Sequence, residues 1–176
     1  PYTRGIERSR DPQTIVAEAR TLFENGYREV TLLGQNVNSY GKSLSEDERI
    51  SFAELLEKIC EIPGDFLVRF MTSHPKDATK KLVDVMAQNE HIARQFHLPL
   101  QSGSSEILRK MNRGYTAEKY VEILDYIKEK LPDATLSTDI IVAFPGETEE
   151  DFEGTMEILG RVRFDMVYSF LYSPRK

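Results

Sequence analysis

Apolar residues recur along this chain at two alternating spacings. Short apolar runs rich in β-branched and aromatic residues, which are typical of buried strands, occupy residues 30–33, 67–71, 95–100, 140–144 and 166–172. Between them, apolar residues recur every three or four positions, as in amphipathic helices, over residues 12–26, 52–62, 82–86, 107–111, 116–131 and 148–160. Five strands that alternate with helices predict an α/β fold with a parallel sheet and right-handed crossovers.

The stretch from Leu136 to Asp151 shows this repeating unit most completely. It reads LSTDIIVAFPGETEED. The apolar run predicts a strand, and Pro145 with Gly146 predicts the turn that ends it. Thr148 then opens a helix, because its hydroxyl can accept a backbone N–H while Asp151, three residues on, reaches back as in a capping box.

Period-two alternation gives this strand two different faces. One face carries Ser137, Asp139, Ile141 and Ala143, and the other carries Thr138, Ile140, Val142 and Phe144. The bulky face is expected to pack under helices, while the face with Ser137 and Asp139 is too small and polar for an ordinary core and is expected to look into a cavity. A second interpretation stays open, in which Asp139 is a structural carboxylate bonded to a neighbouring strand or loop.

Polar residues and glycines gather after the predicted strands and not before them. Ligands bind at the carboxyl edge of parallel sheets and barrels, so this asymmetry predicts a ligand site at that edge. His97 is expected on the same strand face as Gln101, where it would line the cavity, and it lacks the partners of a metal site. Glu147 is equally well explained as an acid that favours the helix dipole. The candidates at the edge are Gln35, Asn36, Ser73, His74, Gln101, Ser102, Asp139 and Glu147.

The composition is that of a globular domain. The chain has 176 residues, of which 40% are hydrophobic and 30% charged, enough for one domain with a substantial core. No apolar run approaches the roughly 20 residues that cross a bilayer, and the first residues lack the apolar segment of a signal peptide, so we expect a cytoplasmic protein with no membrane contact. The net charge of −6 argues against a large nucleic-acid footprint on this segment alone.

Two further features bear on cofactors. Cys60 is the only cysteine of the sequence, which excludes an internal disulfide and a zinc or iron–sulfur site built from this chain alone. It lies on the apolar side of a predicted helix, which favours a buried, unreactive thiol. The first ten residues carry Arg4, Arg8 and Arg10, either as a solvated basic arm or as contacts to an anionic ligand.

Six segments of the chain resemble, in the same order, the radical S-adenosylmethionine (SAM) domain of the tRNA methylthiotransferases of the MiaB type. They read PYTRGIERSR at 1–10, LLGQNVNSYG at 32–41, RFMTSHPKD at 69–77, HLPLQSGSSEILRKMNRGYT at 97–116, LSTDIIVAFPGETEEDF at 136–152 and FDMVYSFLYSPR at 164–175. The forms GQNVNSYG and TSHP are more similar to the enzymes that act on isopentenyladenosine than to the sister enzymes that modify a ribosomal-protein aspartate.

The resemblance implies a partial (β/α) TIM-like barrel, with residues 1–176 as a radical SAM core domain. In this family a Cys-x-x-x-Cys-x-x-Cys loop, which holds a [4Fe-4S] cluster, lies directly before the segment that matches Pro1. A methylthiotransferase domain precedes that loop, and an RNA-binding domain follows the barrel. The chain is therefore expected to be a truncated domain without its first strand, cluster cysteines and flanking domains. We expect it to be inactive by itself and to expose a sheet edge that favours self-association.

For the intact enzyme, the resemblance implies radical chemistry on tRNA. The cluster donates an electron to SAM, and the deoxyadenosyl radical that is released activates carbon two of the modified adenine. A second cluster supplies the sulfur, and another SAM supplies the methyl group. The protein's own share is positioning and the exclusion of water.

The residues expected to bind SAM lie on the matched segments, and no catalytic or metal-ligating residue is assigned. By matched position they are Gln35 and Asn36 at the methionine amino group, Gln101 and Ser102 near the ribose or carboxylate, and Asp139 and Ile141 near the nucleoside, with Ser73, Arg8 and Arg10 completing the set. Two alternatives stay open. One is a sister radical SAM methylthiotransferase that acts on a ribosomal-protein aspartate or another modified adenosine, and the other is a non-catalytic βα module that binds a nucleotide without a cluster.

Overall fold

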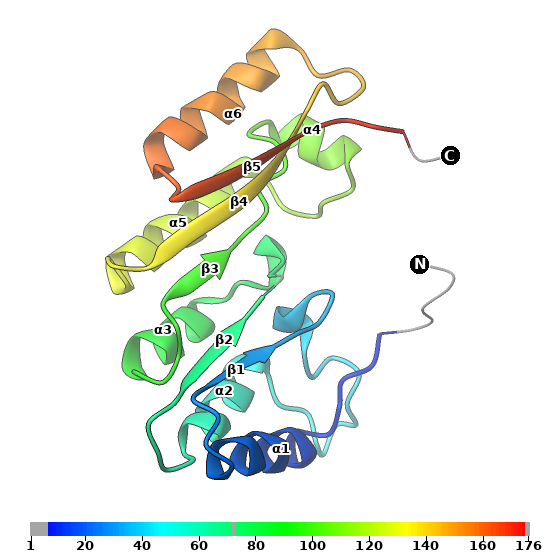
Figure 1. The fold of residues 1–176 in the computed structure, drawn as a ribbon. Coiled ribbons are helices and arrows are strands. Elements are labelled where there is room, and N and C mark those ends of the chain that lie inside the picture. The colour runs from blue at the N-terminus through cyan, green and yellow to red at the C-terminus, as the bar shows by residue number, and fades with distance from the viewer. Residues whose placement is uncertain (1–6, 72, 175–176) are drawn as a thin grey trace. The chain divides into compact units, whose positions relative to one another are not determined.

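The computed structural model describes residues 7–71 and 73–174. Along these residues the chain forms two compact units, each with its own parallel sheet (Figure 1). The first unit takes in the described residues up to 71 together with residues 84–93, and the second takes in residues 73–83 and those from 94 onward. Helix α3 (Lys80–Gln88) contributes residues to both units.

The first unit holds a two-stranded parallel sheet. Its elements are α1 (Pro12–Glu24), β1 (Glu29–Leu32), the 3-10 helix η1 (Val37–Ser39), α2 (Phe52–Cys60) and β2 (Leu67–Phe70). The two strands pair from Glu29↔Leu67 to Leu32↔Phe70. Phe52 of α2 meets Phe70 of β2 edge-on, with 5.2 Å between ring centroids, so α2 covers this sheet with its apolar side.

Local signals in the sequence fix the helix ends of this unit. The Asp11 side chain accepts the backbone N–H of Thr14 before α1, and Pro12 occupies the first turn, where its missing N–H costs nothing. Gly26 follows α1 with a φ of +89°, which a residue without a β-carbon adopts freely. A capping box of Ser51 and Glu54 opens α2.

The second unit holds a three-stranded parallel sheet in the order β3-β4-β5. Its elements are the 3-10 helix η2 (Pro75–Asp77), β3 (Gln95–His97), α4 (Ser105–Lys110), α5 (Ala117–Lys130), β4 (Thr135–Val142), α6 (Glu149–Val162) and β5 (Met166–Leu171). Figure 1 shows β4 as the long central strand, with α4, α5 and α6 around the sheet. The residues of β5 are exposed along its whole length.

A buried hydroxyl pair fastens α5 to this sheet. The Tyr120 hydroxyl donates to the carbonyl oxygen of Leu98 at 2.7 Å and lies 3.2 Å from the Thr138 hydroxyl. Thr138 in turn accepts the backbone N–H of Leu100 at 2.9 Å. Because both side chains are at most 1% exposed, these bonds satisfy polar atoms that would otherwise be costly to bury.

The predicted order of strands and helices is confirmed, with corrections at strand ends. The strand predicted at 140–144 begins earlier, at Thr135. It ends at Val142, because Ala143 has a φ of +58° and leaves the extended region. The strand predicted at 95–100 ends at His97 as a regular strand and continues only through an isolated bridge between Gln101 and Ile140. No helix of the described residues has the length and apolar character needed to cross a membrane.

Candidate functional site

Strand β4 has one covered face and one open face. Along it, Leu136, Thr138 and Ile140 are buried, while Ser137, Asp139 and Ile141 are half-buried. The predicted alternation is therefore confirmed over these six residues. It does not extend to Val142 and Phe144, which were predicted on the bulky face and are only half-buried, because the strand ends at Val142.

Three neighbouring strands bring polar side chains together on the open face. The β3–β4 register places His97 opposite Ser137, and the β4–β5 register places Asp139 opposite Tyr168. His97 Nδ1 lies 3.0 Å from Ser137 Oγ, and His97 Nε2 lies 3.5 Å from Asp139 Oδ2. The Tyr168 and His97 rings meet edge-on, with 6.2 Å between centroids.

These contacts bear on the two interpretations of Asp139. Its carboxylate meets a side chain of the neighbouring strand, as a structural carboxylate would. The same side chain is 26% exposed, and that of His97 is 23% exposed, so a ligand can reach both. Asp139 is thus a held but accessible carboxylate that can accept hydrogen bonds from ligand hydroxyl or amino groups.

The pairing of His97 with Ser137 and the approach of Tyr168 were not predicted from the sequence. The alternation of each strand placed His97, Ser137 and Asp139 on the less buried face, but it carries no information on register. A one-residue slip between β3 and β4 would have turned His97 away from this face.

Gln101 joins the end of β3 to β4 through its backbone. Its N–H donates to the Asp139 carbonyl oxygen at 2.8 Å, and its carbonyl oxygen accepts from the Ile141 N–H at 2.9 Å. Its φ of +69° lies in the left-handed region, which is strained for a residue with a side chain. The structure therefore brings Gln101, Asp139 and Ile141 together at the carboxyl end of the sheet.

The turn after β4 is held by the side chain of Glu147. Glu147 Oε2 accepts the backbone N–H of Ala143 at 2.6 Å, and Lys110 Nζ lies 3.4 Å from the Gly146 carbonyl oxygen. Gly146 has a φ of +81°, and Thr148 with Asp151 forms the predicted capping box of α6. Glu147 therefore stabilises the turn itself.

Two predicted serines are buried in the same unit. Ser102 is 0% exposed, and its hydroxyl oxygen accepts the N–H of Ser104 at 3.2 Å. Ser73 is also buried. Ser104 donates its own hydroxyl to Asp151 at 2.5 Å, which ties the start of α4 to the start of α6. Ser102 thus shapes the loop that carries Gln101.

His74 also lies in the second unit, where its Nδ1 accepts the Lys76 N–H at 3.2 Å and its ring meets Tyr115 edge-on. The other predicted residues lie in the first unit. Gln35 is exposed after β1, and Asn36 is half-buried at the start of η1. Arg10 pairs with Glu18 at 2.7 Å on the surface, and Arg8 is exposed. Arg4 and the other residues before 7 lie outside the described residues.

Backbone and hydroxyl bonds fix the arm at residues 7–10 onto the loop after β1. The Tyr40 hydroxyl donates to the Arg10 carbonyl oxygen at 2.7 Å. Ser9 accepts the Gly41 N–H on its hydroxyl at 3.0 Å and donates its own N–H to Ser43 Oγ at 2.7 Å. The arm is therefore an ordered part of this unit.

The chain does not fit an iron–sulfur cluster by its own residues. Cys60 is half-buried on α2, and burial raises the pKa of its thiol to about 11, which disfavours the thiolate that binds metals. Among residues 7–71 and 73–174, no group of three or more His, Cys, Asp or Glu side chains could hold a metal ion.

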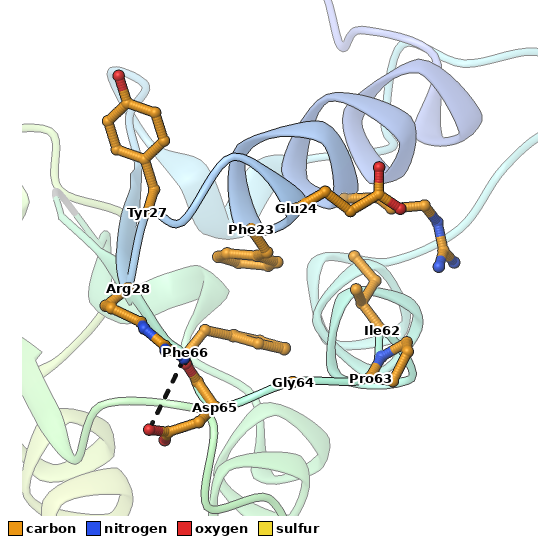
Figure 2. Close-up of a pocket in the computed structure, with 10 residues that line it drawn as sticks. Phe23, Glu24, Tyr27, Arg28, Ile62, Pro63, Gly64, Asp65 and Phe66 are labelled. Carbon is orange, nitrogen blue, oxygen red and sulfur yellow. Dashed lines mark hydrogen bonds and ion pairs between the residues drawn. The ribbon is translucent and has the colours of Figure 1, made fainter.

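A cavity of about 120 Å³ lies at the opposite, amino end of the strands of the first unit (Figure 2). Phe23 stacks on Phe66 at 3.9 Å between ring centroids, and Phe66 stacks on His91 at 4.2 Å. Arg28 beside it donates to the Asp65 carbonyl oxygen at 2.8 Å. None of the predicted ligand residues line this cavity, so the candidate site is the carboxyl end of β3, β4 and β5.

Comparison with protein families matches residues 1–159 to the family described as the Radical SAM superfamily. Two relatives, from Thermoanaerobacter sp. (strain X514) and Clostridium botulinum (strain Alaska E43 / Type E3), are named tRNA-2-methylthio-N(6)-dimethylallyladenosine synthase. They are 55% and 56% identical to the chain over 175 residues, which is 99% of it. The chain spans only 37% and 38% of their respective lengths.

Among solved structures, the fold is similar to the apo, SeMet-labelled form of OxsB, described as a cobalamin-dependent S-adenosylmethionine radical enzyme. The TM-score is 0.64 at 9% sequence identity, over 85% of this chain and 22% of the OxsB chain. The aqua-cobalamin-bound form of OxsB gives a TM-score of 0.61 at 10% identity. At such low identity the likeness concerns the fold alone.

Proposed function

The chain belongs to the radical SAM superfamily, and we propose that it is the core of the SAM-binding domain of a tRNA methylthiotransferase. The proposed reaction is the addition of a methylthio group to carbon two of isopentenyladenosine in tRNA. The observation that carries the proposal is the identity of more than half of the residues, over nearly the whole chain, to enzymes named for that product.

The nucleoside part of SAM fits the open face of the second unit. The Asp139 carboxylate suits the hydroxyls of a ribose, and the half-buried Ile141 offers an apolar surface beside it. Gln101 binds these two residues through its backbone and so keeps them in place. When bound beside a cluster, SAM supplies the radical and methyl chemistry, and these residues bind it, orient it and exclude water.

Gln35 and Asn36, which the resemblance assigns to the methionine part of SAM, follow β1 in the first unit as Gln101 follows β3 in the second. Arg8 keeps an exposed guanidinium for an anionic group. Arg10 pairs with Glu18, and the Ser102 hydroxyl is bonded within its own loop. We therefore propose that Arg10 supports the first unit, and that Ser102 and the buried Ser73 support the second.

The [4Fe-4S] clusters of the whole enzyme must be held by residues outside this chain, since its own residues do not fit a cluster. The same holds for most of the tRNA contacts, because the chain carries a net charge of −6. In the described residues β1 pairs only with β2, so we propose that its other edge mediates self-association of the isolated chain. The whole enzyme is proposed to act in the cytoplasm.

Calorimetric titration with SAM tests the proposal. This chain and the full-length protein, anaerobically reconstituted with iron and sulfide, are titrated side by side. We expect tight binding only by the reconstituted full-length protein, and methylthio transfer only to tRNA that contains isopentenyladenosine. Equal binding by the short chain, with no cluster in the longer one, would instead show a nucleotide-binding module.

A pair of variants tests the assigned face. Asp139→Asn in the full-length protein is expected to weaken SAM binding about tenfold, because a charged acceptor is replaced by a neutral one. Asp47→Asn removes an exposed carboxylate in the loop before α2 and serves as the matched control. Equal SAM affinities of the two variants would show that Asp139 does not contact SAM.

A further inference from the structure

We propose that His97 is a positioning residue that holds the Asp139 carboxylate in one orientation, and that the Ser137 hydroxyl fixes the orientation of the His97 ring. The proposal deepens the proposed function, since the ligand of Asp139 is the nucleoside of SAM. It concerns three side chains that the β3–β4 register brings onto one face.

The first step is to place the protons of the His97, Ser137 and Asp139 side chains. The Ser137 hydroxyl has one hydrogen and two acceptors within reach, His97 Nδ1 at 3.0 Å and the Phe96 carbonyl oxygen at 3.5 Å. When the hydroxyl donates to Nδ1, the single proton of the neutral imidazole is on Nε2. That proton is then on the ring nitrogen nearest Asp139 Oδ2, 3.5 Å away.

The second step concerns the doubly protonated ring. Nδ1 then donates to the serine oxygen, and the hydroxyl hydrogen turns to the Phe96 carbonyl oxygen. Nε2 still carries a proton and still faces Asp139. In both charge states His97 therefore presents a donor to the Asp139 carboxylate. The contact between His97 and Ser137 is also kept in both.

The third step excludes the remaining tautomer. A neutral ring with its proton on Nδ1 would place the Nε2 lone pair against the carboxylate, and two acceptors would face each other. The Asp139 carboxylate itself disfavours this form, whereas the Ser137 hydroxyl can donate to Nδ1 or accept from it and so fits either tautomer.

The fourth step concerns how His97 prepares Asp139 for a ligand. His97 Nε2 lies 3.5 Å from Asp139 Oδ2, and the Asp139 side chain is still 26% exposed. With one oxygen held by His97, the carboxylate is proposed to offer the other oxygen to a ligand hydroxyl. Tyr168 closes the side of the ring that faces β5. Holding a carboxylate before binding lowers the ordering cost of binding.

Two substitutions at position 97 separate the contact of His97 with Asp139 from its contact with Ser137. A glutamine amide nitrogen reaches about as far as Nε2, so His97→Gln keeps a donor for Asp139 and loses the Ser137 bond. An asparagine amide nitrogen reaches about as far as Nδ1, so His97→Asn keeps Ser137 and loses Asp139. Both variants remove the imidazole, which makes each the control of the other.

The affinity of the reconstituted full-length protein for SAM is the first readout. We expect His97→Asn to bind about tenfold more weakly and His97→Gln to stay within about threefold of the wild type. In an Asp139→Asn background, His97→Asn should cause no further loss, since its effect acts through that carboxylate. Equal loss in both glutamine and asparagine variants, or an undiminished loss in the Asp139→Asn background, would overturn the proposal.

The nitrogen chemical shifts of the His97 ring are the second readout and need no ligand. In the neutral ring we expect the proton on Nε2, and we expect Asp139→Asn, whose amide can donate to Nε2, to shift the population toward Nδ1. A dominant Nδ1 proton in the wild type would overturn the proposal. If the wild type binds no SAM, the proposed function fails, and the ring shifts still decide whether His97 holds Asp139.

Discussion

Gly103 lies so close to α6 that a β-carbon at its position would stand 2.4 Å from the carbonyl oxygen of Gly154. The Gly103 N–H also donates to the Thr155 hydroxyl of α6 at 2.7 Å. We expect Gly103→Ala to lower the free energy of unfolding by about 3 kcal/mol, because backbone must move to admit the methyl group. Urea denaturation measures the change.

The same helix supplies a control for this prediction. Gly160 has open space around the position of its β-carbon. Gly160→Ala is therefore expected to raise stability by about 0.5 to 1 kcal/mol, through helix propensity alone. If both substitutions changed stability by the same amount, the close contact of α6 with the Gly103 loop would be refuted.

Alkaline pH should destabilise the protein through two buried tyrosines. Burial raises the pKa of Tyr115 and of Tyr120 well above the ordinary value of 10.0. Below about pH 10 both phenols are protonated in the folded and the unfolded chain, and their contribution to stability is fully present. Above it, only the unfolded chain releases protons, so stability falls by about 1.4 kcal/mol per pH unit for each tyrosine until the folded-state pKa is reached.

The measurement is the free energy of unfolding between pH 8 and 11. Tyr115→Phe combined with Tyr120→Phe should flatten the slope above pH 10, although it lowers stability at pH 8 because hydroxyl bonds to carbonyl oxygens of residues 98–100 are lost. Tyr27→Phe replaces an exposed ring and should leave the slope unchanged. If the double variant lost stability above pH 10 as steeply as the wild type, the two tyrosines would not be the cause of the loss.

Ala143 should tolerate glycine better than any larger residue. Its φ of +58° costs an L-residue about 1 kcal/mol or more, and glycine adopts it without that cost. We expect Ala143→Gly to be neutral or to stabilise by up to about 1 kcal/mol, and Ala143→Val to destabilise by at least as much. Thermal unfolding of the two variants measures this difference. If Ala143→Gly were less stable than Ala143→Val, loss of a methyl contact rather than backbone strain would decide stability at this position.

The capping box of α6 should contribute measurably to stability. Asp151 accepts the N–H and the hydroxyl of Thr148, and Thr148 accepts the N–H of Asp151. Thr148→Ala removes the side-chain acceptor and should cost about 1 kcal/mol, whereas Thr148→Ser keeps it and should cost little. Circular dichroism during urea unfolding reports both values. A serine variant as unstable as the alanine variant would point to the lost methyl group instead.

Much of the fold could be predicted because its signals are local. The capping box at Thr148 and Asp151, and the alternation from Leu136 to Ile141, depend on neighbours within four residues. Each is found as predicted. The order of strands and helices followed from the same short-range patterns.

The rest depends on relations that a local pattern does not contain. The left-handed backbone of Ala143 ended β4 early, and Gln101 also has a left-handed backbone; neither residue type announces that conformation. The contact of His97 with Asp139 requires the register between two strands about 40 residues apart. The Ser102 hydroxyl was expected near a ligand, yet its bond to Ser104 depends on how the loop folds back on itself.

The alternating exposure of β4 has a consequence for genetic screens. Variants at Leu136, Thr138 and Ile140 should lower the amount of folded protein in the cell, because these side chains fill the core. Variants at Ser137, Asp139 and Ile141 should leave abundance nearly normal and reduce activity. In a saturation library, abundance and activity scores would then alternate from one codon to the next along six consecutive positions, and each neighbour would serve as an internal standard for the other class.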